Sequence, residues 1–169
     1  MVLQKLQNGI YNMSQTREFQ ATEEKNGRVL LVEDNYSLLE VVYQILQGQN
    51  YQVTRAESGE EAIEALFKED FDLVITDLNM GTVSGIEVLR KTKELNPETM
   101  VIIMTANHDM EYYGEALELD ACDYLLKPFE LNDFLDRVSH CLRKHEGRQA
   151  GKKRRTTYKE PRNDHNVSL

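Results

Sequence analysis

The sequence predicts an α/β domain built on a doubly wound, parallel, five-stranded sheet with helices on both faces. Two observations lead to this prediction. Five short apolar runs alternate along the chain with stretches whose apolar residues recur at helical spacing, and strands that alternate with helices favour a parallel sheet. Several of the apolar runs also end in polar residues, which is typical of ligand sites at the carboxyl edge of such sheets.

Signals for helix ends place the elements in order. Asn35 is a candidate N-cap for the first helix, and Ser58 with Glu61 has the spacing of a capping box at the start of the second. The third helix is expected to stop before Pro97, because the residue before a proline disfavours helical geometry. The expected strands are 28–32, 51–55, 72–76, 100–104 and 123–126, and the expected helices are near 36–48, 58–69, 84–95, 108–119 and 130–145.

These elements fill residues 27–145, which we interpret as one domain. Residues 1–26 are expected to form an N-terminal extension, in which Val2, Leu3, Leu6 and Ile10 fit a short amphipathic helix. Residues 146–169 lack an apolar period and are expected to form a flexible basic tail.

Charge is distributed unevenly between the domain and this tail. Residues 1–142 contain 11 Lys and Arg against 26 Asp and Glu, a net charge of −15, whereas residues 143–169 contain 9 against 3, a net charge of +6. No apolar run reaches the roughly 20 residues of a membrane span, and we expect a cytoplasmic protein. Cys122 and Cys141 have no metal-ligand spacing and are expected to be reduced, packed thiols.

Polar residues at the strand ends are the candidate functional site. Asp77 ends a buried strand, Glu33 and Asp34 follow another, and Thr105 and Lys127 end two more. Parallel strands bring these groups to one edge of the sheet. Carboxylate oxygens suit Mg²⁺, and a lysine with a hydroxyl suits a phosphoryl group. This set therefore favours Mg²⁺-dependent phosphoryl chemistry over a hydrolytic triad or a nucleotide cradle.

Four motifs in this order resemble the receiver domain of two-component response regulators. The resemblance extends from about Arg28 to Lys144 and includes neither tail. It implies the flavodoxin-like, CheY-like fold. The motifs are Val29-Leu-Leu-Val-Glu33-Asp34-Asn35, Asp77-Leu-Asn-Met80 with Gly85, Ile103-Met-Thr105-Ala106 and Tyr124-Leu-Leu-Lys127-Pro128-Phe129.

The resemblance also implies roles for individual residues. Asp77 would accept a phosphoryl group from a histidine kinase or a phosphotransfer protein. Glu33, Asp34 and Asp77, with the backbone carbonyl of Asn79, would bind Mg²⁺. Thr105, Lys127 and Tyr124 would contact the phosphate or act as the switch. In the loop after Asp77, Gly81 stands where the family often has proline. Glycine makes this loop less rigid but removes no metal ligand.

Such a protein would signal by binding rather than by turnover of an external substrate. The expected surface consists of the helices near 108–119 and 130–145 and the strand at 123–126. It would bind a downstream protein or, after phosphorylation, a second copy of the chain.

Two other functions remain open from the sequence. An aspartyl-phosphate phosphatase of the haloacid-dehalogenase type would need a second aspartate two residues after Asp77, where this chain has Asn79. Nucleic-acid binding through Lys152–Arg155 is the other alternative, and a charge run of this kind is more often simply solvated. No nucleotide-binding fingerprint is present.

Overall fold

The computed structural model describes residues 26–106 and 110–157 of the 169-residue chain. The expected N-terminal extension, apart from its last residue, lies outside the described residues, as does the end of the tail from residue 158. Within the described part no helix is long and apolar enough to cross a membrane.

Five parallel strands form one sheet in the order β2-β1-β3-β4-β5. The order reverses at β1, as in a doubly wound fold, so the predicted architecture is confirmed. The strands are β1 (Arg28–Val32), β2 (Gln52–Ala56), β3 (Leu73–Asp77), β4 (Met100–Thr105) and β5 (Asp123–Leu126).

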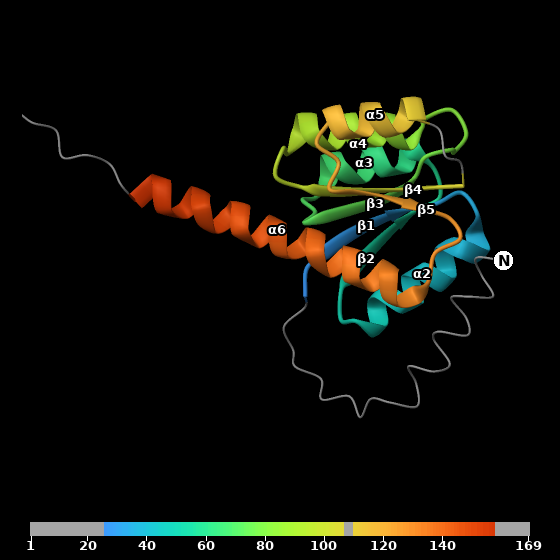
Figure 1. Ribbon diagram of the computed structural model, residues 1–169, viewed down its shortest axis with the longest axis horizontal. Helices are drawn as coiled ribbons and strands as arrows, with labels where there is room; N and C mark the ends of the chain where they lie inside the picture. Colours follow the sequence, from blue (N-terminus) through green and yellow to red (C-terminus); the bar gives the residue numbers. More distant parts are fainter. Residues whose placement is uncertain (1–25, 107–109, 158–169) are drawn as a thin grey trace, which may run out of the picture.

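Helices cover both faces of this sheet, as Figure 1 shows, with α3, α4 and α5 on one face and α2 and α6 on the other. Each helix is part of a crossover between parallel strands, or follows the last strand. The helices are α2 (Tyr36–Gly48), α3 (Gly59–Lys68), α4 (Gly85–Leu95), α5 (Met110–Glu118) and α6 (Leu131–Thr157).

The helix caps follow the local sequence. The Asn35 side chain accepts a hydrogen bond from the Leu38 backbone N–H at 3.0 Å, and Ser58 caps α3 in the same way through Glu61. Ser84 and Glu87 form a complete capping box at the start of α4. Each such cap satisfies backbone donors that the first turn leaves unpaired, and is worth about 1 kcal/mol.

The core lies in two layers, one on each side of the sheet. One layer packs α2 and α6 against the sheet and centres on residues such as Leu39 and Phe134, and the other packs α3, α4 and α5 and includes Leu78 and Leu89. Strands β3 and β4 are buried along their whole length. The strands are packed between these two layers, and the candidate functional residues lie at or just after the strand ends.

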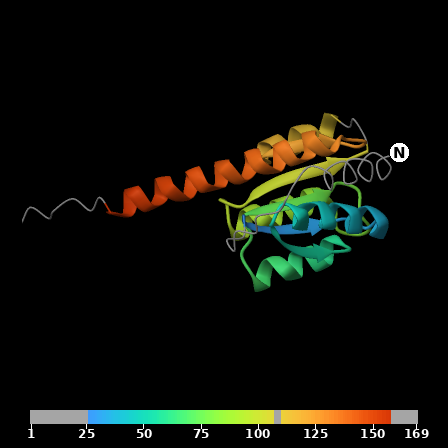
Figure 2. The same ribbon diagram turned by 90° about the horizontal axis from the view of Figure 1, so that it is seen from below.

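The last helix is longer than the sequence analysis predicted. The prediction ended it near residue 145, whereas α6 continues to Thr157, and Figures 1 and 2 both show its distal part extending past the sheet. The extra residues are mostly Arg, Lys, Gln and Ala, which are good helix formers. Gly147 and Gly151 each oppose the helix by only about 1 kcal/mol, so the absence of an apolar stripe did not mark its end.

The prediction of reduced cysteines was also wrong for this structure, because Cys122 and Cys141 form a disulfide. Cys122 directly precedes β5 and Cys141 lies on the buried face of α6, and their Cα atoms are 6.0 Å apart. This distance lies within the range that a disulfide spans. Only the packing of α6 beside β5 brings together two residues 19 positions apart.

His145, to which the sequence analysis assigned no role, anchors α6 to the amino edge of the sheet, the edge where the strands begin. It is 8% exposed. Its Nδ1 donates to the Glu98 carbonyl oxygen at 3.0 Å, and its Nε2 lies 3.3 Å from the Asp72 carboxylate. Asp72 in turn accepts the Arg28 backbone N–H at 2.7 Å. One histidine therefore joins α6 to the segments that lead into β3 and β4.

Candidate functional site

Three carboxylates meet at the carboxyl edge of the sheet, the edge where the strands end. Glu33 and Asp34 follow β1, and Asp77 is the last residue of the neighbouring strand β3. One oxygen from each of the three side chains lies within 4.8 Å of the others. Val32 pairs with Thr76, so the sheet register itself places the residues that follow these two positions side by side.

Lys127 brings a positive charge to this cluster. Its Nζ lies 2.7 Å from Glu33 Oε2 and 3.1 Å from Asp77 Oδ2, and only 9% of the side chain is exposed. The Lys127 backbone N–H donates to the Thr105 carbonyl at 2.6 Å, which holds the end of β5 against the end of β4. The ammonium is thereby directed between two carboxylates.

Burial and charge oppose one another at Glu33. The residue is 2% exposed, and burial raises the pKa of its carboxyl above the ordinary value, although Lys127 lowers it in part. The nearby charge of Asp77 raises the pKa of Glu33 further. A buried carboxylate is costly unless it is paired. Two carboxylates that share one ammonium therefore leave an excess of negative charge at this edge.

The loop after Asp77 is held tightly against the sheet. The Leu78 N–H donates to the Met104 carbonyl at 2.7 Å, and the Gly85 N–H donates to the Leu78 carbonyl at 2.9 Å. A Cβ atom on Gly85 would collide with the Asp77 carbonyl oxygen. Glycine is therefore required where α4 begins. Asp77, at the edge of the sheet, is 8% exposed. Asn79 lies in this loop with its side chain exposed.

Thr105 and Tyr124 are related to the cluster in different ways. Thr105 is the last residue of β4 and is completely buried. It directly follows Met104, the residue of β4 that pairs with Asp77. Tyr124 lies on β5 and is half-buried. Its ring packs edge-to-face on Tyr113 of α5, with 5.3 Å between centroids. Tyr124 therefore packs against α5 beside β5, whereas Thr105 lies at the carboxyl edge of the sheet.

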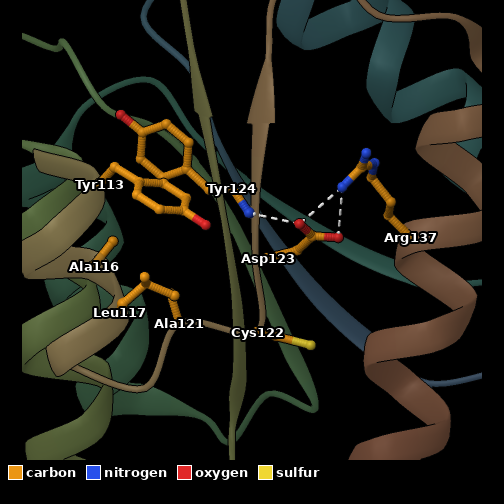
Figure 3. A pocket seen from close by; sticks show the side chains of 8 residues that line it. All are labelled: Tyr113, Ala116, Leu117, Ala121, Cys122, Asp123, Tyr124 and Arg137. Atoms are coloured by element: carbon orange, nitrogen blue, oxygen red, sulfur yellow. Dashed lines mark hydrogen bonds and ion pairs between the residues drawn. The ribbon is translucent and has the colours of Figure 1, made fainter. Parts of the chain in front are cut away.

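A cavity of about 320 Å³ lies beside β5, the outermost strand on one side of the sheet, between α5 and α6. Figure 3 shows the rings of Tyr113 and Tyr124 on one side and the Asp123–Arg137 ion pair on the other. Arg137 Nη1 lies 2.8 Å from Asp123 Oδ1, and the same oxygen accepts the Tyr124 N–H. Leu117, which is 57% exposed, also lines the cavity.

The donor set at the carboxyl edge fits a divalent cation. Magnesium takes hard oxygen ligands, usually one or two carboxylates with several waters. Glu33 and Asp77 are buried, whereas Asp34 is exposed and open to solvent. Side chains with this chemistry and spacing can hold such an ion, and the excess negative charge favours it.

The structure thus brings together Glu33, Asp34, Asp77 and Lys127 from the predicted site, with Thr105 at the same edge. Sequence reasoning missed the Glu33–Lys127 contact, which joins residues 94 positions apart. It also missed the cavity beside β5. The size of that cavity depends on the distances of α5 and α6 from the strand, and the sequence does not indicate these distances.

Comparison with known proteins places these features in a family. Residues 29–139, more than half of the chain, match the family model described as the response regulator receiver domain. Sporulation initiation phosphotransferase F of Bacillus subtilis is 32% identical over 117 residues, which cover 69% of this chain and 94% of that protein. The transcriptional regulatory protein ZraR of Escherichia coli is 39% identical over 105 residues, or 62% of this chain, but the chain spans only 24% of that protein.

Solved structures agree with this result. The receiver domain protein (CheY-like) of Methanospirillum hungatei superposes with a TM-score of 0.70 and 28% identity, over 72% of this chain and 97% of the other. The BeF3-activated DrrB receiver domain has a TM-score of 0.64 and 33% identity, over 69% of this chain and 97% of that one.

Proposed function

This chain belongs to the response regulator receiver domain family of two-component signalling, and from that premise we propose that Asp77 is its phosphoacceptor. The donor is a phosphohistidine on a sensor histidine kinase or a phosphotransfer protein. The observation that carries the proposal is the placement of Asp77, with its carboxylate 3.1 Å from Lys127 and inside a cluster of three carboxylates.

The chemistry is a phosphoryl transfer between two side chains. An Asp77 carboxylate oxygen attacks phosphorus, the phosphorus–nitrogen bond of the donor breaks, and the imidazole leaves with that electron pair. The product is an acyl phosphate. Lys127 already lies against Asp77, so its ammonium can pair with a phosphoryl oxygen without a large movement.

Magnesium would be held by Glu33, Asp34 and Asp77 with the Asn79 backbone carbonyl. It would neutralise charge on the phosphoryl oxygens. The support for this assignment is the donor set and its excess of negative charge.

The direct experiment treats the protein with acetyl phosphate and Mg²⁺ and locates the modification by mass spectrometry. We expect one labile phosphoryl group on Asp77 and none in Asp77→Asn. Asp72→Asn is the matched control, because Asp72 precedes the same strand at the opposite edge. Undiminished phosphorylation in Asp77→Asn would overturn the assignment.

The output surface is the face formed by α5, β5 and α6. Its exposed side chains include Tyr112, Tyr113 and Leu117, and the cavity beside β5 opens on the same side. We assign to this face a downstream protein or, after phosphorylation, a second copy of the chain. Aromatic and aliphatic residues around a cavity are what a protein partner needs as anchors.

Thr105 and Tyr124 would connect the phosphoryl group to this surface. The Thr105 hydroxyl would donate to a phosphoryl oxygen, and its movement would let Tyr124 turn inward. Thr105→Ala should still accept phosphate, but the shift of NMR signals at residues 110–130 on phosphorylation should largely vanish. The coupling at stake is about 1–3 kcal/mol. Equal shifts in parent and variant would separate Thr105 from signalling.

On this account the protein is a switch in the cytoplasm and does not turn over an external substrate. A phosphatase of the haloacid-dehalogenase type remains disfavoured, because Asn79 replaces the aspartate that such an enzyme needs as its acid.

A further inference from the structure

The distal part of α6 carries a dense run of positive charge away from an acidic body. Residues 143–157, which we call the basic arm, contain seven Lys and Arg against one Glu, whereas residues 1–142 have a net charge of −15. The helix continues to Thr157, and both views show this end extending past the sheet. We propose that the basic arm binds the phosphate backbone of double-stranded DNA.

The arm lacks the apolar residues that other partners would require. Among the side chains of α6 that the structure describes, Leu142 and His145 are the last buried ones. Residues 146–157 contain no aliphatic side chain larger than alanine and no aromatic one. A helix that lies on a membrane needs an apolar face, and a protein interface depends on aromatic or aliphatic anchors. Nucleic-acid binding requires neither, because release of counterions from the phosphates drives it.

The shape of the arm fits duplex DNA in particular. A single helix with its side chains is about 10–12 Å across, and the major groove of B-DNA is about 12 Å wide. The corresponding groove of duplex RNA is deep and narrow and excludes side chains. DNA also presents about one phosphate for every 1.7 Å of its axis, which suits a run of closely spaced cations.

The acidic body does not cancel this attraction. The last contacts between α6 and the body that involve described side chains are those of His145 and Arg148, the latter with Asp120 at 3.0 Å. From Arg148 the helix rises about 6 Å to Lys152 and about 10 Å to Arg155, and the Debye length is about 8 Å at physiological salt. The carboxylates of the domain are therefore partly screened from Lys152 and Lys153, and more strongly screened from Arg155 at the far end of the run.

Binding should also stabilise the arm itself. Lys144, Arg148 and Lys152 recur every four residues, a spacing at which like charges on a helix repel by a few tenths of a kcal/mol per pair. A polyanion relieves this repulsion. An increase in helical circular dichroism on addition of DNA is therefore a second readout, independent of affinity.

The experiment measures fluorescence anisotropy of a labelled 20-base-pair duplex with the full chain, between 50 and 200 mM KCl. Four phosphate contacts predict a slope of log K against log salt of about −3.6 and a loss of affinity of roughly a hundredfold across this range. The test variant replaces all four cations, Lys152→Gln, Lys153→Gln, Arg154→Gln and Arg155→Gln. It should bring the slope close to zero and abolish the gain in helicity.

A matched control removes four positive charges from the body instead, by Arg55→Gln, Lys68→Gln, Arg90→Gln and Lys91→Gln. These residues form surface ion pairs of small energetic value, and the control should keep most of the parent's affinity and all of its helicity gain. The proposal is overturned if the parent does not bind at 50 mM KCl, or if the two quadruple variants lose affinity equally. Equal affinity for an RNA duplex would overturn the assignment to DNA.

Discussion

The two edges of the sheet differ in how their charged groups are paired. At the carboxyl edge, Glu33 and Asp77 are buried with Lys127 between them, and Asp34 adds a third carboxylate. At the amino edge, Asp72 is matched by the Arg28 N–H and by His145, whose other nitrogen donates to a carbonyl.

One edge therefore holds unbalanced charge and the other holds satisfied pairs. Unbalanced buried charge costs stability and is typical of functional sites, whereas matched groups contribute to stability. We propose that the carboxyl edge serves function, whereas the contacts at the amino edge attach α6 to the sheet.

The largest expected effect is at Lys127, the cation of the carboxyl edge. Lys127→Met leaves two buried carboxylates without their ammonium, which should lower the free energy of unfolding by about 3 kcal/mol in EDTA. A divalent cation can replace the lost charge, so Mg²⁺ should restore much of the loss. Urea titrations with EDTA and with Mg²⁺ measure both quantities.

Lys93→Met is the control for that prediction. Lys93 is similarly buried, with 12% of its side chain exposed, but it lies toward the amino edge, where its Nζ donates to the Thr99 carbonyl at 2.9 Å. Its loss should cost about 1–2 kcal/mol, and Mg²⁺ should not restore it. Rescue of both variants by Mg²⁺ would erase the distinction between the edges.

The next effect concerns the anchor of α6. His145→Ala removes the hydrogen bond to the Glu98 carbonyl and the partner of Asp72, and should destabilise the protein by about 2–3 kcal/mol. His140→Ala is a matched control on the same helix, because His140 is exposed, and it should change stability by less than about 0.5 kcal/mol. Chemical denaturation compares them, and equal losses would mean that His145 is not an anchor.

The smallest effect is a gain in stability at Glu33, and it depends on pH. Burial raises the pKa of Glu33 in the folded protein, so the folded state binds this proton more tightly than the unfolded state. The contribution of Glu33 is then greatest below its ordinary pKa and falls as pH rises from that value through the raised one.

Glu33→Gln cannot ionise and should avoid that fall. In EDTA it should be more stable than the parent at pH 7, and the difference should shrink toward about pH 4, near the ordinary carboxyl pKa. Unfolding free energies of both proteins at the two pH values measure this change. A difference that does not vary with pH would show that Glu33 ionises as easily in the folded protein as in the unfolded chain.

Local signals made much of the molecule predictable. Asn35, Ser58 and Ser84 begin helices where their side chains can cap them, and buried strands end at Asp77 and Thr105 because the apolar runs end there. The ends of these strands in turn predicted that the carboxylates lie together, because parallel strands all end at the same edge of the sheet.

The remaining features depend on contacts between distant parts of the chain. The disulfide of Cys122, the anchor between His145 and Asp72, and the Glu33–Lys127 pair each require helix and sheet positions that no local pattern encodes. The prediction ended α6 too early, near residue 145, for a different reason. A helix can continue beyond its apolar stripe where good helix formers follow.

The most direct test of the division between the edges is the change in unfolding free energy on addition of Mg²⁺. The parent should gain about 1.4 kcal/mol when Mg²⁺ is at about ten times its dissociation constant. Asp34→Asn, at the carboxyl edge, should lose most of that gain, whereas Asp72→Asn, at the amino edge, should keep it despite a lower starting stability. A gain in Asp34→Asn as large as that of the parent, or a loss of the response to Mg²⁺ in Asp72→Asn, would contradict this difference between the two edges.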